Sequence, residues 1–487
     1  MLLFSILFPV LLGLGMLLKG EFTNRKTLLS LTGAGLLITA ALGMSVVFAG
    51  ETELLLFSFG KNLDLYFHVD NLGKLFAVVV NVVWVLSGFY SFEYMKHEQE
   101  ETRFFGFYLM VHGILHGLVF AGGMVTYYLF YELMTLLSVP LILHNRSKDA
   151  IKGGLKYLFY SLFGAYMVLF GLFFLNRFAD TLNFLPGGSL NLGAVAGHEQ
   201  LMLVVAFSMI IGFSVKAGMF PLHAWLPTAH PVAPAPASAV MSGIIVKAGV
   251  LGMIRVAYYL VGADFIRGTW VQTVWMSLAL LTVFMGSMLA YREKVMKKRF
   301  AFSTVSQASY ILFGLSLLQP AAMTGALLHV VFHAVIKSCL FLSAGTIIYK
   351  THKTNVEDLR GIGKEMPVAM WCYTFAAAAL IGIPPASGFI SKWYLATGAL
   401  ESGIAVFSWL GPVVLLTSAL LTAGYLLPIT VNGFLPGADF DYAALEKKEP
   451  CFTMLLPLMI LALLAVVLGL FPNPLTEYIA GITAVVL

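Results

Sequence analysis

The chain has 487 residues, of which 59% are hydrophobic and only 11% are charged. A soluble globular protein carries about 25% charged residues, so this composition excludes a water-covered surface and indicates an all-α polytopic membrane protein. The net charge of +5 is small and becomes informative only when the basic residues are assigned to loops. Cys339, Cys372 and Cys451 lie far apart without metal-binding spacing, so the sequence predicts no iron–sulfur, zinc or other metal site.

Apolar segments long enough to cross a bilayer recur along the chain. We expect about fourteen spans, which begin near residues 2, 26, 72, 103, 122, 151, 200, 235, 268, 298, 321, 367, 405 and 451. The first segment, residues 2–18, lacks a preceding basic region and a small-residue cleavage site, so we predict a span and not a signal peptide. Between the second and third spans, ETELLLFSFGKNLDLYFHVD alternates apolar and polar residues, which predicts a short hairpin outside the membrane.

The positions of lysine and arginine predict the orientation of these spans. If the first loop is cytoplasmic and the sides alternate, nineteen basic residues fall in cytoplasmic loops and four fall in the opposite loops. The four are Lys61, Lys74, Arg177 and Arg267, and the nineteen are Lys19, Arg25, Lys26, Lys96, Arg103, Arg146, Lys148, Lys152, Arg292, Lys294, Lys297, Lys298, Arg299, Lys350, Lys353, Arg360, Lys364, Lys447 and Lys448. Cytoplasmic loops are enriched in basic residues, so we predict an even number of spans with both termini outside.

Several charged residues remain inside the predicted spans, where a charge is costly and usually marks an ion path. The basic ones are Lys156, Lys216, Lys247, Arg255, Lys337 and Lys392, and the acidic residue well inside a span is Glu132. Lys156 lies near a helix start and Arg255 near a membrane end, so we expect these two side chains to snorkel to the surface.

The sequence also predicts two interrupted spans, each beside a lysine. Five prolines lie between residues 221 and 236, shortly after Lys216. In LIGIPPASGFISKW, glycines and prolines break another span just before Lys392, which lies near the end of this motif. Backbone groups freed at membrane depth must be satisfied by protein or water, and paired breaks point to structural repeats. We therefore predict two inverted five-helix repeats, 103–260 and 268–435, flanked by N-terminal spans in 1–102 and a C-terminal span in 451–487.

Glu132 and Lys216 form the first predicted proton site. A lysine buried alone loses its proton easily because desolvation disfavours the charged form, and a nearby carboxylate reverses this effect. A lysine whose partner approaches and withdraws is therefore a proton site of adjustable affinity. The alternative is a static ion pair that fixes helix packing.

A second set of titratable groups extends this site. Lys247 is about a dozen residues from either end of its span, too far to snorkel, and we interpret it as a central relay. His329, His333 and Lys337 in HVVFHAVIKS are spaced i, i+4 and i+8, so they form one stripe on a helix. Histidine titrates near neutral pH, and such a ladder with water passes protons. A purely structural hydrogen-bonded stripe is the alternative.

Three other polar motifs have competing interpretations. His223 and His230 flank the first break, where they either gate proton uptake or only satisfy loose carbonyls. His112 and His116 form another i, i+4 pair, for which we expect core packing. The basic start of KKRFAFSTVSQASY at 297–310 is most simply an orientation signal.

Several of these motifs resemble those of antiporter-like subunits, which occur in respiratory complex I, in Mrp-type cation/proton antiporters and in membrane-bound hydrogenases. The matching segments are KAGMFPLHAWLPTAHPVAPAPASAVMSGIIVKAG, YELMTLLS, KKRFAFSTVSQ, HVVFHAVIKS, DLRGIG and GIPPASGFISKW, and together they cover roughly residues 70–435. The resemblance implies fourteen spans, two inverted repeats and a charged axis at the membrane midplane. By motif position it assigns the family's charged residues to Glu132, Lys216, Lys247, His329, His333 and Lys392.

Some positions depart from the family pattern. Thr228 stands where aspartate is usual, which puts in doubt a second acid at the cation entrance. Some members carry glutamate at the position of Lys392, and a lysine at this position is similar to the D-type subunits of Mrp antiporters and to some complex I subunits.

We therefore expect a non-catalytic, ion-translocating subunit of a larger complex in the cell (inner) membrane of a prokaryote, with no cofactor of its own and no nucleic-acid partner. Protons would be taken up near Lys216 and Lys247, pass along the His/Lys axis and leave near Lys392, driven by redox chemistry or Na+ exchange in partner subunits. One alternative is a stand-alone secondary cation/proton antiporter. A remote one is a membrane acyl- or glycosyltransferase with a histidine base.

Overall fold

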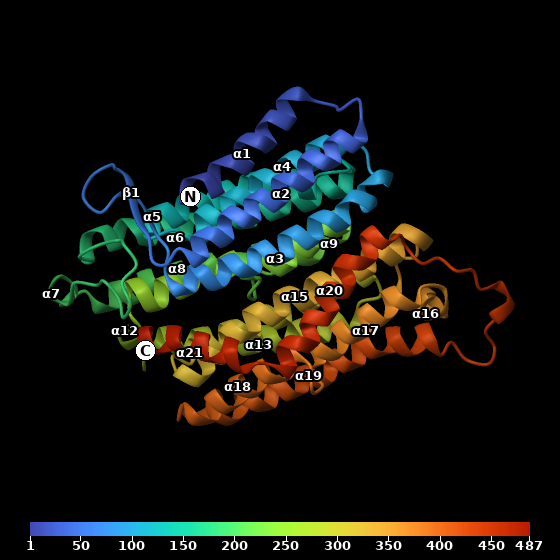
Figure 1. Cartoon of the computed structure of the whole chain (residues 1–487). Coiled ribbons are helices and arrows are strands. Elements are labelled where there is room, and N and C mark those ends of the chain that lie inside the picture. The colour runs from blue at the N-terminus through green and yellow to red at the C-terminus, as the bar shows by residue number, and fades with distance from the viewer.

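The protein is a stack of long helices that run side by side, with most connections gathered at their two ends (Figure 1). The computed structural model describes the backbone of residues 1–487 and the side chains of 1–443 and 445–487. Within these residues, eleven helices are long and apolar enough to cross a membrane. This architecture confirms the predicted all-α polytopic class.

The elements follow one another along the chain in three groups. The first are α1 (Leu2–Lys19), α2 (Arg25–Phe48), β1 (Glu53–Ser58), β2 (Asp64–His68), α3 (Asn71–Tyr94), η1 (Met95–His97), α4 (Glu101–Val119), α5 (Met124–Ile142) and α6 (Lys148–Phe178). Next come α7 (Leu192–Val195), α8 (Glu199–Ala217), α9 (Leu226–Val232), α10 (Ala235–Val240), the π-helical η2 (Met241–Ile245), α11 (Val246–Ile254) and the π-helical η3 (Arg255–Leu260). The last are α12 (Ala263–Ile266), α13 (Trp270–Arg292), α14 (Met296–Ser316), α15 (Pro320–Thr351), η4 (Val356–Leu359), α16 (Ile362–Glu365), α17 (Pro367–Ile381), α18 (Ser387–Glu401), α19 (Ala405–Phe434), η5 (Tyr442–Ala444), α20 (Phe452–Leu470) and α21 (Asn473–Val486).

The predicted hairpin is confirmed. Strands β1 and β2 pair antiparallel, with Glu53 opposite His68 and Ser58 opposite Asp64. The hairpin projects from the end of the helices at which both chain termini also lie (Figure 1). The loops that connect α3 to α4 and α5 to α6 lie at the other end.

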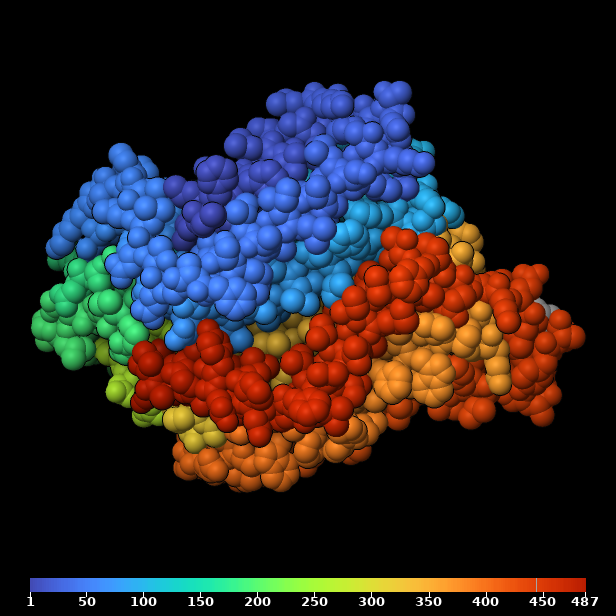
Figure 2. All heavy atoms as spheres, in the orientation of Figure 1, coloured from blue at the N-terminus to red at the C-terminus, as the bar shows by residue number. Residues whose placement is uncertain are grey.

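Two helical segments form the centre of the molecule. The apolar windows of residues 235–260 and of α15 are completely buried, whereas only 33% of the window is buried in α1 and α19 and 39% in α6. In Figure 2 the C-terminal segment lies across the visible face between the N-terminal helices and the helices near residue 400. The central pair carries Lys247 and the His329–His333–Lys337 stripe, so the predicted relay groups lie away from the lipid-facing surface.

Both predicted helix breaks are present. Helix α8 ends at Ala217 and is followed by Gly218, whose φ is 79°. Helix α17 ends at Ile381 and is followed by Gly382, whose φ is 93°. Glycine adopts this left-handed conformation without the steric cost of a Cβ atom and commonly terminates helices. The chain then resumes as α9 after the first break and as α18 after the second.

The C-terminal segment differs in detail from the single predicted span of 451–487. It forms two helices, because α20 ends at Leu470 and α21 begins at Asn473. Pro472 and Pro474 lie at this junction. Proline lacks the N–H that would continue the helical ladder, so the break follows from the local sequence.

Candidate functional site

Lys216 occupies the last turn of α8 and is completely buried. Its ammonium donates hydrogen bonds to three hydroxyls, Thr135 Oγ1 at 2.9 Å, Tyr157 OH at 3.0 Å and Ser161 Oγ at 2.8 Å. Lysine has three N–H donors, so these neutral groups from α5 and α6 satisfy all of them. The carbonyls at the end of α8 also favour a cation at this position.

Glu132 lies on α5 and is half-buried. Its Oε1 atom is buried without a hydrogen-bond partner among the described side chains. Within the same part of the chain it forms no ion pair with Lys216, whose ammonium is directed to the three hydroxyls. In this structure, therefore, Glu132 and Lys216 are not in ion-pair contact.

The backbone at the first break is held by specific side chains. The indole Nε1 of Trp225 donates to the carbonyl of Val215 at 2.8 Å. The N–H of Phe220 donates to Thr282 Oγ1 at 3.0 Å. Helical backbone groups freed by a break must find such partners when they are buried, so the loop is anchored to both α8 and α13.

His223 and His230, beside this break, have different surroundings. His223 is half-buried and stacks on Phe220, with ring centroids 5.9 Å apart. His230 is completely buried and stacks on Phe341 at 4.7 Å. Both ring nitrogens of His230, and Nδ1 of His223, are buried without a partner among the described residues. Among the described residues, therefore, no carbonyl is bound by His230 or by Nδ1 of His223.

Lys156 contacts the segment that follows the same break. Its ammonium donates to Thr228 Oγ1 at 3.1 Å. Thr228 is the residue that departs from the aspartate usual in related sequences, and it accepts a hydrogen bond at the place where a carboxylate would form an ion pair.

Lys247 lies on α11, directly after the π-helical turn η2. Its ammonium donates to the carbonyl of Ser242 at 2.6 Å and lies 2.5 Å from Nδ1 of His333. A π-helical turn displaces backbone groups from the regular ladder and often occurs at functional sites. The turn thus supplies the Ser242 carbonyl, and α15 supplies the titratable partner.

The two histidines of the predicted stripe on α15 are in contact with each other. The rings of His329 and His333 stack with centroids 5.7 Å apart. His329 Nδ1 lies 2.9 Å from Ser391 Oγ on α18. Lys337 donates to the carbonyl of Phe300 at 3.1 Å. The Nε2 atoms of both histidines are buried without a partner within the described residues, so a purely hydrogen-bonded structural stripe leaves two buried donors or acceptors unexplained.

Lys392 lies beside the second break, as predicted. Its ammonium donates to the carbonyls of Leu380 at 2.7 Å and Ile381 at 2.9 Å, which are the last two residues of α17. It also lies 5.2 Å from the ring centroid of Tyr310. Lys392 therefore caps the broken helix and follows Ser391, the partner of His329, in the chain.

These contacts join the predicted residues into a set. Lys247 contacts His333, His333 stacks on His329, and His329 contacts Ser391 next to Lys392. The helix of Lys216 packs closely on that of Lys247, because a Cβ atom at Gly249 would lie 2.9 Å from Lys216 Cβ.

Arg255 was expected to snorkel, and this expectation is wrong. Its side chain is 1% exposed and binds Asp70 through two hydrogen bonds, Nη1 to Oδ2 at 2.5 Å and Nη2 to Oδ1 at 2.8 Å. The guanidinium also lies 4.8 Å from the ring centroid of Phe184 and 4.7 Å from that of Tyr259. Asp70 precedes Arg255 by 185 residues, so no local pattern could identify the pair.

We expect Asp70→Asn to lower the free energy of unfolding by about 3 kcal/mol, because loss of one partner leaves a buried charge uncompensated. Unfolding of the purified protein in detergent measures this change. The control is Asp264→Asn, which removes the partner of Arg267 on the surface, where an ion pair contributes about 1 kcal/mol or less. Equal stability of the two variants would contradict the assignment.

The sequence did not reveal that two basic residues at the start of α14 are buried. Lys297 and Arg299 are 6% and 9% exposed, although we interpreted their motif only as an orientation signal. Lys297 donates to the carbonyls of Pro231, at 3.2 Å, and Ala233. Lys298, between them, pairs with Glu293 at 2.8 Å and is 42% exposed. A run of basic residues at a helix start does not reveal which of them turns inward.

His112 and His116 have the expected packing role. Each ring places Nε2 3.0 Å from Oδ1 of Asn81. His116 Nδ1 also lies 3.1 Å from the carbonyl of Ser5, and the ring of His112 stacks on Trp84. The cluster connects α1, α3 and α4.

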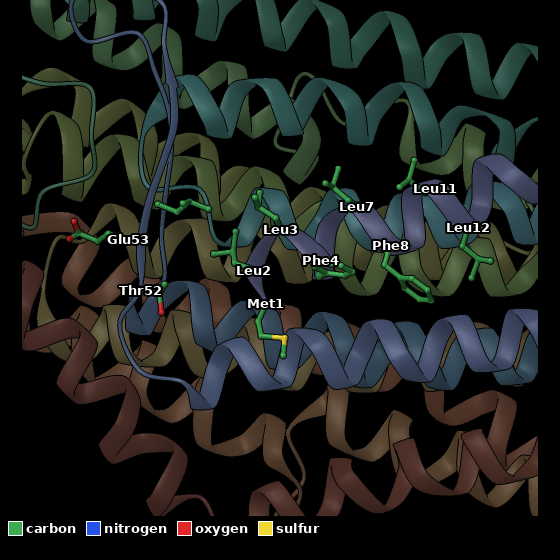
Figure 3. Close-up of a pocket in the computed structure, with 11 residues that line it drawn as sticks. Met1, Leu2, Leu3, Phe4, Leu7, Phe8, Leu11, Leu12, Thr52 and Glu53 are labelled. Carbon is green, nitrogen blue, oxygen red and sulfur yellow. The ribbon is translucent and has the colours of Figure 1, made fainter.

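A large groove along α1 is a different kind of surface. It has a volume of about 810 Å³, and Figure 3 shows its lining between α1 and the start of the hairpin. The lining is aliphatic or aromatic apart from Thr52 and Glu53. Such a surface suits lipid or an apolar helix better than an ion, so the candidate site remains the buried lysines and histidines.

Comparison with known proteins agrees with this geometry. Residues 121–422 match the family described as NADH:quinone oxidoreductase/Mrp antiporter, TM, and residues 57–105 match the complex I chain 5 N-terminus. The chain is 33% identical to NADH-quinone oxidoreductase subunit N of Desulforudis audaxviator over 77% of its own length and 75% of that protein. It is 31% identical to hydrogenase-4 component B of Escherichia coli over 84% of its length, and this match spans 62% of the relative.

A solved structure of the Mrp complex from Dietzia contains a chain of the same fold. It superposes with a TM-score of 0.86 at 20% identity, over 100% of this chain and 97% of that one. The profile match extends over more than half of the sequence and includes both helix breaks. This protein is therefore a multi-pass integral membrane protein that belongs to the NADH:quinone oxidoreductase/Mrp antiporter family of transmembrane subunits.

Proposed function

We propose that this chain translocates protons as one subunit of a multisubunit membrane complex, driven by redox chemistry or cation exchange in its partners. The relatives are named as a subunit of NADH-quinone oxidoreductase and a component of hydrogenase-4, and the structural neighbour belongs to an Mrp complex. One observation carries the proposal: Lys247 Nζ lies 2.5 Å from His333 Nδ1. This contact joins titratable groups from two separate helical segments in a buried, continuous set.

The proposed path follows these contacts. Uptake occurs near Glu132 and Lys216, where the carboxylate approaches and withdraws from the ammonium. Lys247 takes the proton next and passes it to the stripe of His333, His329 and Lys337. Lys392 releases it beside the second break. A lysine and an imidazole at hydrogen-bond distance compete for one proton. A charge that arrives near one of these groups therefore changes the proton affinity of the other.

The architecture that we propose has fourteen spans. Three further segments, α4, α14 and the broken α17–α18 helix, add to the eleven long apolar helices. They fall within two repeats, 103–260 and 268–435, related by inversion. The broken helix is the fourth element of each repeat, after a helix of 31 residues in α6 and 32 residues in α15. This matching order supports the repeats, between the spans of 1–102 and the segment 451–487.

We propose that both termini lie outside the cell membrane of a prokaryote. Both termini lie at the hairpin end of the helices (Figure 1). The loops that carry most of the basic residues, such as 95–103 and 292–299, would then face the cytoplasm.

The test of this function is proton transport by the assembled complex in proteoliposomes. We expect His333→Gln to slow transport by about tenfold or more, since glutamine keeps a hydrogen-bonding side chain but cannot titrate. The amount of assembled complex should be unchanged. Wild-type transport by this variant, or a wild-type complex that moves no protons, would contradict the proposal.

A further inference from the structure

Two adjoining cavities open where α3 ends and α4 begins, far from both chain termini (Figure 1). The larger one has a volume of about 450 Å³ and is lined by charged and polar side chains, including Glu100 and Arg146. The smaller one, of about 180 Å³, reaches Lys297 and the backbone that follows His230. Glu98 and Asn145 line both, so the cavities meet at these residues.

Glu98 is the acidic group at this junction. It is half-buried. Burial raises the pKa of its carboxyl above the ordinary value, although Lys297 and His97 act in the opposite direction. A carboxyl with this balance of influences binds and releases protons more readily near neutral pH than an exposed one.

Lys297 is a buried residue that lines the smaller cavity. Its ammonium donates to the carbonyls of Pro231 and Ala233, which follow His230 in the broken-helix segment. Glu98 lies within electrostatic reach of this ammonium across the cavity. The lysine thus stands between a water-accessible carboxyl and the protein interior.

His230 directly precedes Pro231, whose carbonyl accepts a hydrogen bond from Lys297. Its ring is completely buried, both of its nitrogens lack a partner among the described residues, and it stacks on Phe341. Two cations are close enough to influence it electrostatically, Lys297 from α14 and Lys337 from α15. Lys337 is four residues from His333 on the same face of α15, and His333 contacts Lys247.

We infer that Glu98 and Lys297 form the proton-loading site of a second entrance, which delivers protons through His230 to Lys337 and is separate from the Glu132–Lys216 site. The inference rests on the proposed function and names the residues at its mouth. Water in the two cavities supplies protons to Glu98, and Lys297 transfers them to the unpartnered imidazole. His230 then passes them to the stripe on α15. Each group gains one proton from the group before it and passes one proton to the group after it, so no other reactant is needed.

The alternative role for Lys297 is structural, as a clamp on two carbonyls. Lys297→Arg distinguishes the two roles, because arginine keeps the charge and the donors but does not release its proton. In the assembled complex in proteoliposomes, we expect Lys297→Arg and Glu98→Gln each to slow transport by about tenfold or more. Glu98→Asp, which keeps a titratable carboxyl, should retain most of the rate. Lys298→Met, on the same turn but paired with Glu293, is the matched control and should transport normally.

The outcomes separate this site from the function itself. Wild-type transport by Glu98→Gln or by Lys297→Arg, in a complex that His333→Gln slows, would overturn the second entrance and leave the proposed function intact. A complex in which His333→Gln also transports normally would overturn the proposed function instead. Slow transport by Glu98→Gln, with recovery in Glu98→Asp, supports the loading site. Because glutamine has nearly the same shape as glutamate, Glu98→Gln keeps the test valid if Lys297→Arg fails to assemble.

Discussion

Lys216→Met should reduce proton transport by the assembled complex by at least about a hundredfold, the effect expected when a proton-transfer group is removed. Methionine fills a similar volume but carries no proton. The complex should persist, because two of the three hydroxyls around Lys216 have other partners. Thr135 Oγ1 donates to the carbonyl of Tyr131 at 3.0 Å, and Tyr157 OH lies 2.7 Å from Ser138 Oγ. Transport is measured in proteoliposomes, and assembly is measured by the yield of complex.

The matched control for this variant is Lys152→Met. Lys152 lies on α6, the helix that supplies Tyr157 and Ser161, but its side chain is exposed. We expect normal transport from this control. An assembled Lys216→Met complex that transports at the wild-type rate would remove Lys216 from the path.

Lys392→Ala should also block transport, by at least about a hundredfold. Lys392 is the titratable residue that directly follows Ser391, the partner of His329, in the chain. Its ammonium binds the last two carbonyls of α17, so the alanine variant loses a helix cap in addition to a proton site. The transport rate per assembled complex separates these two effects.

Lys392→Arg provides the sharper comparison. Arginine keeps a positive charge and N–H donors for the carbonyls of Leu380 and Ile381 but remains protonated. We expect it to restore assembly without restoring transport. Recovery of both would show that Lys392 is only a cap. Glu401→Gln, at the exposed end of the same helix, is the control for general damage to α18.

The residues of the proposed path were predictable because each carries a charged or titratable group within an apolar segment. A lysine within an apolar run, such as Lys216 or Lys247, is costly in a bilayer and therefore noticeable. His329, His333 and Lys337 fall on one helix face by spacing alone, and the structure confirms that the two histidine rings stack. The two breaks were evident from clustered proline and glycine, whose backbone restrictions are local.

The partners of these residues were not predictable. The hydroxyls that bind Lys216 come from α5 and α6, 55 to 81 residues earlier. Serine, threonine and tyrosine are common in apolar helices, so no pattern distinguishes Thr135, Tyr157 and Ser161 from their neighbours. The same limit applies to Asp70, which pairs with Arg255 across 185 residues.

By itself, the sequence determined that this protein crosses the membrane many times, where its helices break, and that charged residues such as Lys216 and Lys247 lie within apolar spans, because hydropathy, backbone restriction and charge are properties of single residues and short segments. Only the tertiary structure decided that Glu132 and Lys216 are apart, that Lys247 meets His333, and that Lys297 turns inward beside the cavity at Glu98. These facts depend on how helices far apart in the chain pack together, and packing selects partners by distance and orientation in three dimensions.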